Sequence, residues 1–491
     1  MHLVGRNGER GPVLTLWFIV GVFLILATGV VVGAPVRIIA PAVGVSVVVV
    51  MLQRRLTSWN ALLALTVIVI LFIPIRRYSM PGNLPFQLEP YRLVVAGVGA
   101  AWLTSLLIDR RLRIRPTGLE GPLMAFAVCA LASVLANSSR IDALNVQSYV
   151  AKKLTFFLSF YLVVYIVMSV VRTQKQVDFL LRILVGGGAM VAAAAMFESW
   201  THHDLFNDLH SILPFLRLTD PPQTELRGAR LRVFASAQHP IALGAVLIMM
   251  LPLAVYLAKR TGHRRWWAVC MLVLLGAFST VSRTSVMMLL VIGLVFLWLR
   301  PETKRAWPLL VPMLLVAHVA LPGALGTLQA AFFPKGGLIA EQQANAGKRG
   351  SGRIGDLGPA IAQFERQPLI GEGFGTRVTD EGIGTAQILD DQWLGTLLET
   401  GLAGVVSWIW LYVRFVRRLG RAAKEDDSDR SWLYTAIAAS VAAYSAGMFT
   451  YDAWSFIQVT FVLFILLGLG SAALGPVPAR RKSPEAAHAM G

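Results

Sequence analysis

The sequence predicts an all-α polytopic membrane protein, with about fourteen transmembrane helices in a single domain. Of its 491 residues, 56% are hydrophobic and 15% are charged, and the mean hydropathy is +0.63. These values are too apolar for a soluble globular protein. Because a hydrocarbon core about 30 Å thick needs roughly 20 apolar residues per helix, the repeated apolar runs are long enough to cross a bilayer many times.

The predicted membrane helices follow apolar runs that are separated by polar segments. In chain order they cover 13–33, 36–52, 58–75, 91–108, 119–136, 148–171, 178–198, 239–258, 265–281, 284–299, 306–322, 391–413, 431–449 and 454–474. Arg6 and Arg10 precede the first run, as in a signal peptide, but the run is longer than a typical h-region, so we interpret it as a retained anchor. The transmembrane domain then covers 1–474, and the polar segment 475–491 is expected to be a disordered cytoplasmic tail.

Positive charge in alternate loops sets the expected orientation. Counting from an N-terminus inside the cell, every cytoplasmic loop is rich in Lys or Arg, as the positive-inside rule requires. These loops are 53–55, 110–115, 172–175, 259–265, 300–305, 414–430 and the tail around 480–482. The alternation favours an even number of helices and predicts that both termini lie in the cytoplasm.

The formal net charge of +18 follows largely from these loops. Topology and attraction to anionic lipids explain it. Because no compact basic domain lies outside the membrane, we expect no nucleic-acid partner. The two cysteines, Cys129 and Cys270, lie in predicted helices and are expected to be packing residues.

Two longer segments, about 199–238 and 323–390, fall on the predicted outer side. Within the second, apolar residues at helical spacing predict an amphipathic helix at 353–366, which lies on the membrane or on the bundle and ends before Pro368. The apolar positions are Ile354, Leu357, Ile361 and Phe364. No inverted repeat is visible, which weakens an interpretation as a secondary transporter.

Three charged residues are predicted at the outer ends of helices, although they lie far apart in the sequence: Arg232, Arg283 and Asp390. An arginine offers a forked, permanently charged set of donors for phosphate oxygens, and a carboxylate can take a proton from an attacking hydroxyl. Their shared face suits transfer of a group from a phosphate-linked lipid. Simpler interpretations stay open, because outer arginines can anchor a helix and Asp390 could cap the helix that follows, with Asp391 adding favourable charge.

Four ordered blocks between about 225 and 410 resemble the O-antigen ligase and O-antigen polymerase superfamily of polytopic membrane glycosyltransferases. The blocks are Arg232-Val233-Phe234 through Pro240, Ser282-Arg283-Thr284, Arg353 through Pro368-Leu369-Ile370-Gly371-Glu372-Gly373-Phe374-Gly375, and Asp391-Gln392-Trp393-Leu394 with Glu399-Thr400-Gly401-Leu402-Ala403-Gly404. The resemblance implies a glycosyltransferase C-type fold in the bacterial inner membrane, with an active site on the extracytoplasmic face.

Two positions depart from the family pattern. Ligase-like members begin the last block with His-Asn, where this chain has Asp390 and Asp391, and the glycine of the first block is Ala235. Because the variant with aspartate is similar to exopolysaccharide polymerases, we favour a polymerase of surface polysaccharide or exopolysaccharide. A ligase that uses another acceptor is the alternative.

The resemblance implies metal-independent transfer of an oligosaccharide from a polyprenyl diphosphate carrier to a glycan acceptor, with no cofactor. Asp390 or Asp391 would act as the base, and His239 and Glu399 are the next candidates. The residues that would hold the leaving diphosphate are Arg232, Arg283 and Arg353. The expected partners are the lipid-linked oligosaccharide, the glycan acceptor, membrane lipids and other proteins of polysaccharide assembly.

Other motifs have simpler explanations. Gly371-x-Gly373-x-Gly375 follows no strand and is expected to be a turn rather than a dinucleotide site. His202 and His203 are adjacent and cannot easily share one metal ion. The residues expected to snorkel near outer helix ends are Glu198, Lys152 and Lys153. The residues that could either contact the lipid diphosphate or anchor a helix are Arg76 and Arg77.

Two other functions are compatible with many membrane helices. A flippase or transporter of lipid-linked oligosaccharides would need charged groups along a cavity between two halves, whereas this chain concentrates its loop length and unusual charges on one side. A peptidoglycan polymerase of the shape-and-division type would share a carboxylate in an outer loop but usually has fewer helices.

Overall fold

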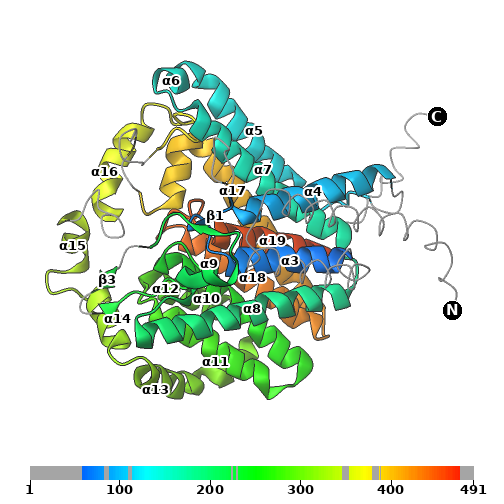
Figure 1. Cartoon of the computed structure of the whole chain (residues 1–491), viewed down its shortest axis with the longest axis vertical. Coiled ribbons are helices and arrows are strands. Elements are labelled where there is room, and N and C mark those ends of the chain that lie inside the picture. The colour runs from blue at the N-terminus through cyan, green and yellow to red at the C-terminus, as the bar shows by residue number, and fades with distance from the viewer. Residues whose placement is uncertain are drawn as a thin grey trace, which may run out of the picture.

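The computed structural model describes residues 58–81, 88–108, 113–222, 225–227, 230–344, 353–378, 386 and 389–475, which are mainly helical (Figure 1). The predicted spans at 13–33 and 36–52 and the predicted tail lie outside these residues. The long helices are α3 (Trp59–Phe72), α4 (Pro90–Ile108), α5 (Glu120–Ala136), α7 (Gln147–Val170), α8 (Gln174–Thr201), α10 (Pro240–Thr261), α11 (Arg264–Ser279), α12 (Arg283–Leu299), α13 (Leu310–Ala320), α17 (Gln392–Glu425), α18 (Arg430–Gly447) and α19 (Ile457–Leu474). The short ones are α6 (Ser138–Ala143), η1 (Leu205–Asp208), α9 (Leu209–Ile212), η2 (Pro301–Leu309), α14 (Ala324–Phe332), α15 (Leu338–Ala344) and α16 (Arg353–Phe364).

Length and hydropathy identify a polytopic membrane protein. Within the described residues, six helices are long and apolar enough to cross a membrane, and α3, α5 and α12 are shorter apolar helices. Helices α13 and α14 together pass the same test but are bent by 111°. Every predicted span inside the described residues falls on a helix, and the count of fourteen stays a prediction.

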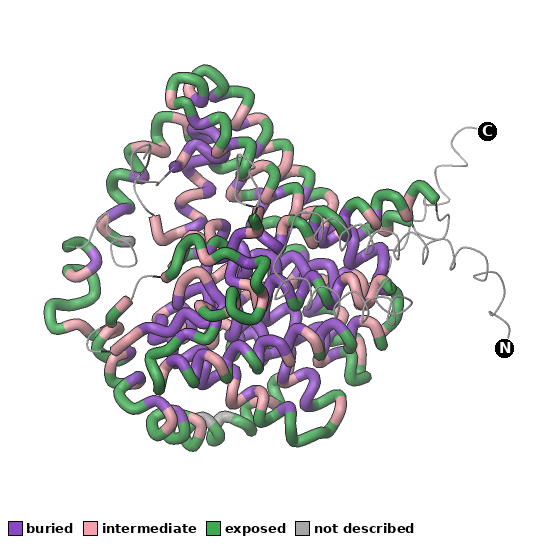
Figure 2. The backbone as a smooth tube through the Cα atoms, in the orientation of Figure 1, coloured by how far each residue is buried: buried purple, intermediate pink, exposed green. Residues whose placement is uncertain are grey.

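The centre of the bundle is built around α10, which has buried residues on all its sides. A helix that is apolar all round is stable only when it is surrounded by other helices, and α10 packs against α8, α11, α12 and α18. Helix α19 is similarly enclosed, whereas α4 keeps much of its surface exposed. The buried residues therefore concentrate in the middle of the molecule (Figure 2).

The sequence did not predict strands, and the structure contains two short antiparallel pairs. Strand β1 (Tyr78–Ser79) pairs with β2 (Arg217–Leu218), and β3 (Leu226–Arg227) pairs with β4 (Arg230–Leu231). Short extended segments can pair in this way because they lie in the connections between helices rather than in the lipid-facing part of the bundle. The prediction of a mainly helical membrane protein is confirmed, and these two-residue strands are local features of the connections.

We use the name loop face for the end of the bundle that is formed by the described residues of 202–238, 321–378 and 448–456. Strand β3 and helices α14, α15 and α16 are at the left in Figure 1. Helix α16 confirms the predicted helix at 353–366. Its Ala360 and Phe364 pack against Leu394 and Leu398 of α17, so part of its apolar surface covers the bundle. The predicted apolar residues of its first three turns, from Ile354 to Ile361, remain exposed.

Helix α17 differs from the prediction of a simple span at 391–413. It extends to Glu425, and it is broken at Gly401, which has φ 65° and ψ −166°. A backbone with positive φ strongly favours glycine. The break divides α17 into a short segment at the loop face and a long segment that continues through the bundle.

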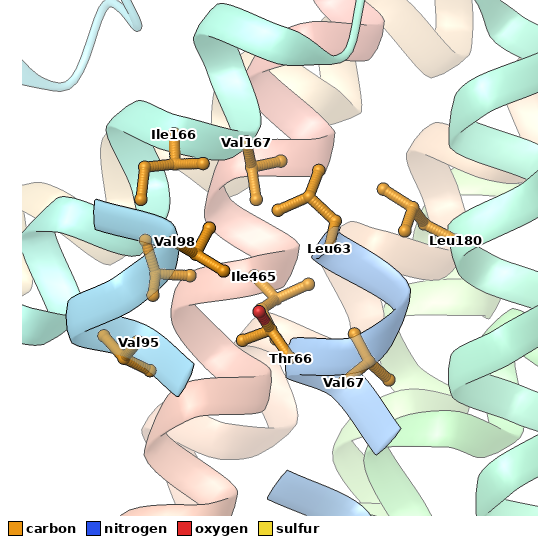
Figure 3. A pocket seen from close by; sticks show the side chains of 10 residues that line it. Leu63, Thr66, Val67, Val95, Val98, Ile166, Val167, Leu180 and Ile465 are labelled. Carbon is orange, nitrogen blue, oxygen red and sulfur yellow. The ribbon is translucent and has the colours of Figure 1, made fainter. Parts of the chain in front are cut away.

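An apolar cavity lies among α3, α4, α7, α8 and α19 (Figure 3). Its only polar lining residue is Thr66, whose hydroxyl donates to the carbonyl of Leu62 at 2.9 Å. Because no charged side chain lines it, this cavity cannot hold a diphosphate. The charged residues that the sequence suggests for such a ligand lie instead at the loop face.

Candidate functional site

Arg232 follows β4 and is buried, with 6% of its surface exposed. Its Nη1 lies 2.7 Å from Oε2 of Glu225, and its Nε donates to the carbonyl of Thr280 at 3.4 Å. Its Nη2 is also buried and has no hydrogen-bond partner among the described residues. A buried N–H group without a partner is costly, so this atom is available for an anionic ligand.

Arg283 is the first residue of α12 and follows a tight turn in which Val281 has φ 49°. This confirms the turn that the sequence predicts between two helices. Its Nη1 donates to the carbonyl of Ala331 at 3.0 Å and lies 4.0 Å from Oε2 of Glu341. The side chain is 13% exposed, so the guanidinium can still be reached from the loop face.

Two arginines of the β3–β4 hairpin, which precedes Arg232, were not predicted from the sequence. Arg227 donates to the carbonyl of Val281 at 2.8 Å, so the hairpin holds the turn before Arg283 from two positions. Arg230 donates to Ser199 at 2.8 Å and to the carbonyl of Pro322. The signal that could have found them is the dense alternation of charge and leucine from Glu225 to Arg232.

Asp390 and Asp391 have different environments. Asp391 is the N-cap of α17, because its carboxylate accepts from the backbone N–H of Leu394 at 3.0 Å. The interpretation of Asp390 as the cap is therefore wrong by one residue. Asp390 precedes the cap, and its position leaves it one residue outside the helix.

Electrostatics links the three predicted residues. Burial lowers the pKa of Arg232, the negative charges of Glu225 and Asp390 oppose this effect, and the positive charge of Arg283 adds to it. Charges that act on one buried guanidinium must lie near it. Arg283 and Asp390 therefore lie within electrostatic reach of Arg232.

The loop that carries the first block, around Phe234 and Ala235, is held by a buried carboxylate, that of Glu198. Ala235, which stands at the family's glycine position, has φ 42°, a conformation that glycine adopts more easily. The backbone N–H groups of Phe234 and Ala235 donate to the two oxygens of Glu198 at 3.0 and 2.8 Å. The expectation that Glu198 snorkels is wrong, because its carboxylate is buried and satisfies this loop.

Arg77 also supports this loop and does not reach outward. Its Nη1 lies 2.7 Å from Asp204, and its Nη2 donates to the carbonyl of Ala237 at 2.6 Å. Burial raises the pKa of Asp204, and the charge of Arg77 opposes this rise. With 3% of its surface exposed, Arg77 is a buried support rather than an interfacial anchor or a free diphosphate ligand.

His239 and Glu399, the next candidates for a base, both have hydrogen-bond or ion-pair partners within the protein. His239 is the N-cap of α10: its Nδ1 accepts from the N–H of Ile241 at 3.1 Å, so Nε2 carries the proton and lies 3.0 Å from Glu225. Glu399 is 1% exposed and is bound by Lys153. Lys153 therefore points into the bundle, and the expectation that it snorkels is wrong.

A second group of charges surrounds Arg377, which the sequence analysis did not single out. Its Nη1 donates to Gln363 at 3.2 Å. Burial lowers its pKa, and the charges of Glu399, Asp452, Glu372 and Asp356 oppose this effect. Glu372 also pairs with Arg140 at 2.6 Å.

The third and fourth blocks meet at the break in α17. The N–H of Leu402 donates to the carbonyl of Pro368 at 2.9 Å, and the N–H of Glu372 donates to the carbonyl of Leu398 at 2.9 Å. The break thus exposes backbone groups that the 368–372 segment satisfies. The predicted turn at Gly371, Gly373 and Gly375 is confirmed, since all three have positive φ.

The 448–456 loop lies between these two groups of charges. Thr450 shares a hydrogen bond of 2.8 Å with Thr284, next to Arg283, and Phe456 stacks on His239. Between Thr450 and Phe456, the ring of Trp454 faces the ammonium of Lys153 at 5.6 Å. The loop also carries Asp452. Like Asp390, this acid lies at the boundary of an apolar helix, so the same sequence pattern could have identified it.

The remaining sequence-based candidates take no defined place in this site. Arg353 begins α16, and its side chain is outside the described part of the structure. Nε2 of His203 lies 2.9 Å from Oδ2 of Asp208. Among the residues that the structure describes, no group of three or more His, Cys, Asp or Glu side chains could hold a metal ion.

Residues 268–409 match the family model described as O-antigen ligase (Wzy_C). The resemblance to the O-antigen ligase and polymerase superfamily is thereby confirmed. The match includes the blocks around Arg283, Gly371 and Gly401 and ends before the last two helices. The match supports a membrane glycosyltransferase-like ligase or polymerase, and proteins of this family use a lipid-linked glycan and a glycan acceptor. No curated protein matches the chain.

Proposed function

We propose that this protein is a polysaccharide polymerase that transfers an oligosaccharide from a polyprenyl diphosphate to the growing glycan. The observation that carries the proposal is the place of Arg232: its Nε donates to the Thr280 carbonyl in the turn before Arg283, and its buried Nη2 has no hydrogen-bond partner among the described residues. The charges of Arg283 and Asp390 act on this guanidinium. The loop face would be the extracytoplasmic face of the inner membrane, with both termini in the cytoplasm and a glycosyltransferase C-type arrangement of about fourteen helices.

In this reaction the acceptor hydroxyl oxygen attacks the anomeric carbon of the donor sugar. The bond between that carbon and the phosphate oxygen breaks, and the polyprenyl diphosphate leaves with the bonding electrons. Arg232 and Arg283 stabilise its negative charge, and Arg353 is a third candidate for this role. The carboxylate of Asp390 accepts the hydroxyl proton. The two guanidinium groups supply the positive charge that the leaving diphosphate needs, so we propose that the transfer does not depend on a metal ion.

Asp390 favours a polymerase over a ligase, because ligase-like members have histidine at this place. His239 does not replace that histidine, since both of its ring nitrogens have partners. The polymerase and ligase hypotheses predict different products. A polymerase extends the donor oligosaccharide into a ladder of repeats, whereas a ligase moves a single glycan to a different acceptor.

The test is to incubate the purified protein in lipid nanodiscs with the lipid-diphosphate oligosaccharide from a strain that lacks this gene. We expect a ladder of repeats with release of polyprenyl diphosphate, in the presence and absence of EDTA. Transfer of one unit to another acceptor would establish a ligase. Movement of the lipid-linked glycan across the bilayer without release of the diphosphate would establish a flippase.

A further inference from the structure

Glu225 occupies a central place in the site, although it lies outside all four family blocks. Its Oε2 is 2.7 Å from Nη1 of Arg232, and its Oε1 is 3.0 Å from Nε2 of His239. One carboxylate thus contacts the start of α10 and the arginine that follows β4. The backbone reinforces this arrangement, because the N–H of Arg232 donates to the carbonyl of Glu225 at 2.9 Å.

The partners of Glu225 are themselves fixed. His239 caps α10 through Nδ1, and its ring stacks on Phe456 with centroids 5.4 Å apart and an interplanar angle of 17°. Its Nε2–H can then point only along the direction of Glu225. Since the imidazole cannot rotate without losing the cap, it holds the carboxylate in turn.

Glu225 also determines which part of Arg232 remains available. Nη1 is held by Glu225 and Nε faces the carbonyl of Thr280, whereas the buried Nη2 has no partner among the described residues. Burial acts to raise the pKa of Glu225, but the hydrogen bond from His239 and the charges of Arg232 and Arg227 hold it below the usual value. The carboxylate therefore stays negative at neutral pH and compensates the buried guanidinium.

From this geometry we propose that Glu225 is a positioning residue for the donor diphosphate. It fixes the Arg232 guanidinium between His239 and the turn at Thr280, so that Nη2 faces the ligand. The inference rests on the proposed function, because it takes Arg232 as the group that binds the diphosphate. Pre-positioning matters because a guanidinium N–H group binds a phosphate oxygen well only when it already points towards that oxygen.

The experiment measures binding of farnesyl diphosphate to the full-length protein in detergent, with farnesol as the uncharged comparison. We expect Glu225→Gln to weaken farnesyl diphosphate binding by about 10- to 100-fold, by analogy with the loss of residues that orient metal ligands. Farnesol binding should not change. Glu225→Asp keeps the charge and should recover part of the affinity. Glu302→Gln is the matched control, because Glu302 also faces an arginine, Arg300 at 4.0 Å, away from the loop face.

The double variant Arg232→Ala with Glu225→Gln separates positioning from general stability. If Glu225 acts through Arg232, the double variant should bind no more weakly than Arg232→Ala alone. Additive losses would overturn the proposal, and so would unchanged or tighter binding by Glu225→Gln, which would make Glu225 a spectator or a competitor of the ligand. If Arg232→Ala itself binds normally, the proposed donor site is wrong. If only Glu225→Gln binds normally, the proposed function stands and the role of Glu225 falls.

Discussion

Lys153 of α7 lies 2.6 Å from both carboxylate oxygens of Glu399 in α17, two residues before the break at Gly401. The ammonium also lies over the rings of Phe374 and Trp454, at 5.1 and 5.6 Å. One cation therefore contacts the broken helix, the third family block and the 448–456 loop. The ion pair joins the segments that surround the second group of charges.

The first prediction concerns this ion pair. Lys153→Met should destabilise the protein by about 3–5 kcal/mol, because it leaves the buried Glu399 charge without its partner. Thermal unfolding in detergent measures the effect. Adding Glu399→Gln should restore much of the loss, since it removes the unpaired charge. Lys175→Met, at an exposed position, is the control. If both lysine variants unfold at the same temperature, the pair contributes no stability.

The second prediction concerns the break in α17. A Cβ added to Gly401 would lie 2.3 Å from the carbonyl carbon of Leu369, and the φ of 65° already disfavours any other residue. We expect Gly401→Ala to cost at least about 1–3 kcal/mol and to displace the 368–372 segment.

The matched control for this change is Gly97→Ala in α4, where nothing lies within 4 Å of the added Cβ and alanine favours the helix. Unfolding temperature and accessibility of the 368–372 segment to protease report the two effects. A Gly401→Ala protein as stable as Gly97→Ala would mean that the two blocks can separate without cost.

Much of this architecture could be predicted from periodicity and charge. The apolar runs located the helices, and the amphipathic spacing around Leu357 and Phe364 located α16. The predicted membrane topology then placed Arg232, Arg283 and Asp390 on one face before their surroundings were known. These features depend on local sequence, which hydropathy and residue chemistry describe well.

What could not be predicted depends on contacts between distant segments. Nothing local distinguishes a snorkelling lysine from Lys153, whose partner lies in α17, or an anchoring arginine from Arg77, which supports the loop at Ala237. The break at Gly401 was hidden for the same reason, because a glycine inside an apolar helix pattern is usually tolerated. The break is stabilised by the carbonyl groups of Pro368 and Leu369, which accept from the N–H groups of Leu402 and Ala403.

The third prediction separates a diphosphate-binding arginine from an anchor. Arg283→Lys keeps the charge but loses the fork that can bind two phosphate oxygens. We expect strong loss of glycan assembly with normal abundance in the membrane, and the same result for Arg232→Ala. Arg217→Ala removes an exposed arginine of β2 and should keep full activity. Normal activity in both Arg283→Lys and Arg283→Ala would remove this residue from the diphosphate site.

The last prediction separates the two aspartates before α17. Asp391 is the helix cap, so Asp391→Ala should lower stability by about 1 kcal/mol, and Asp391→Asn should be nearly neutral because asparagine caps as well as aspartate. Asp390→Asn keeps the size of the side chain but removes its negative charge and its ability to accept a proton. If Asp390 is the base, the protein should be folded and abundant while the rate falls by about 10²–10⁴-fold, far more than a change of helix cap could cause. Polymer amount and length from the purified protein, together with its unfolding temperature, measure both effects.

Normal polymerisation by Asp390→Asn would mean that another group accepts the hydroxyl proton. Asp452 would then be the first residue to test, because it is the acid of the 448–456 loop, which lies between the two groups of charges.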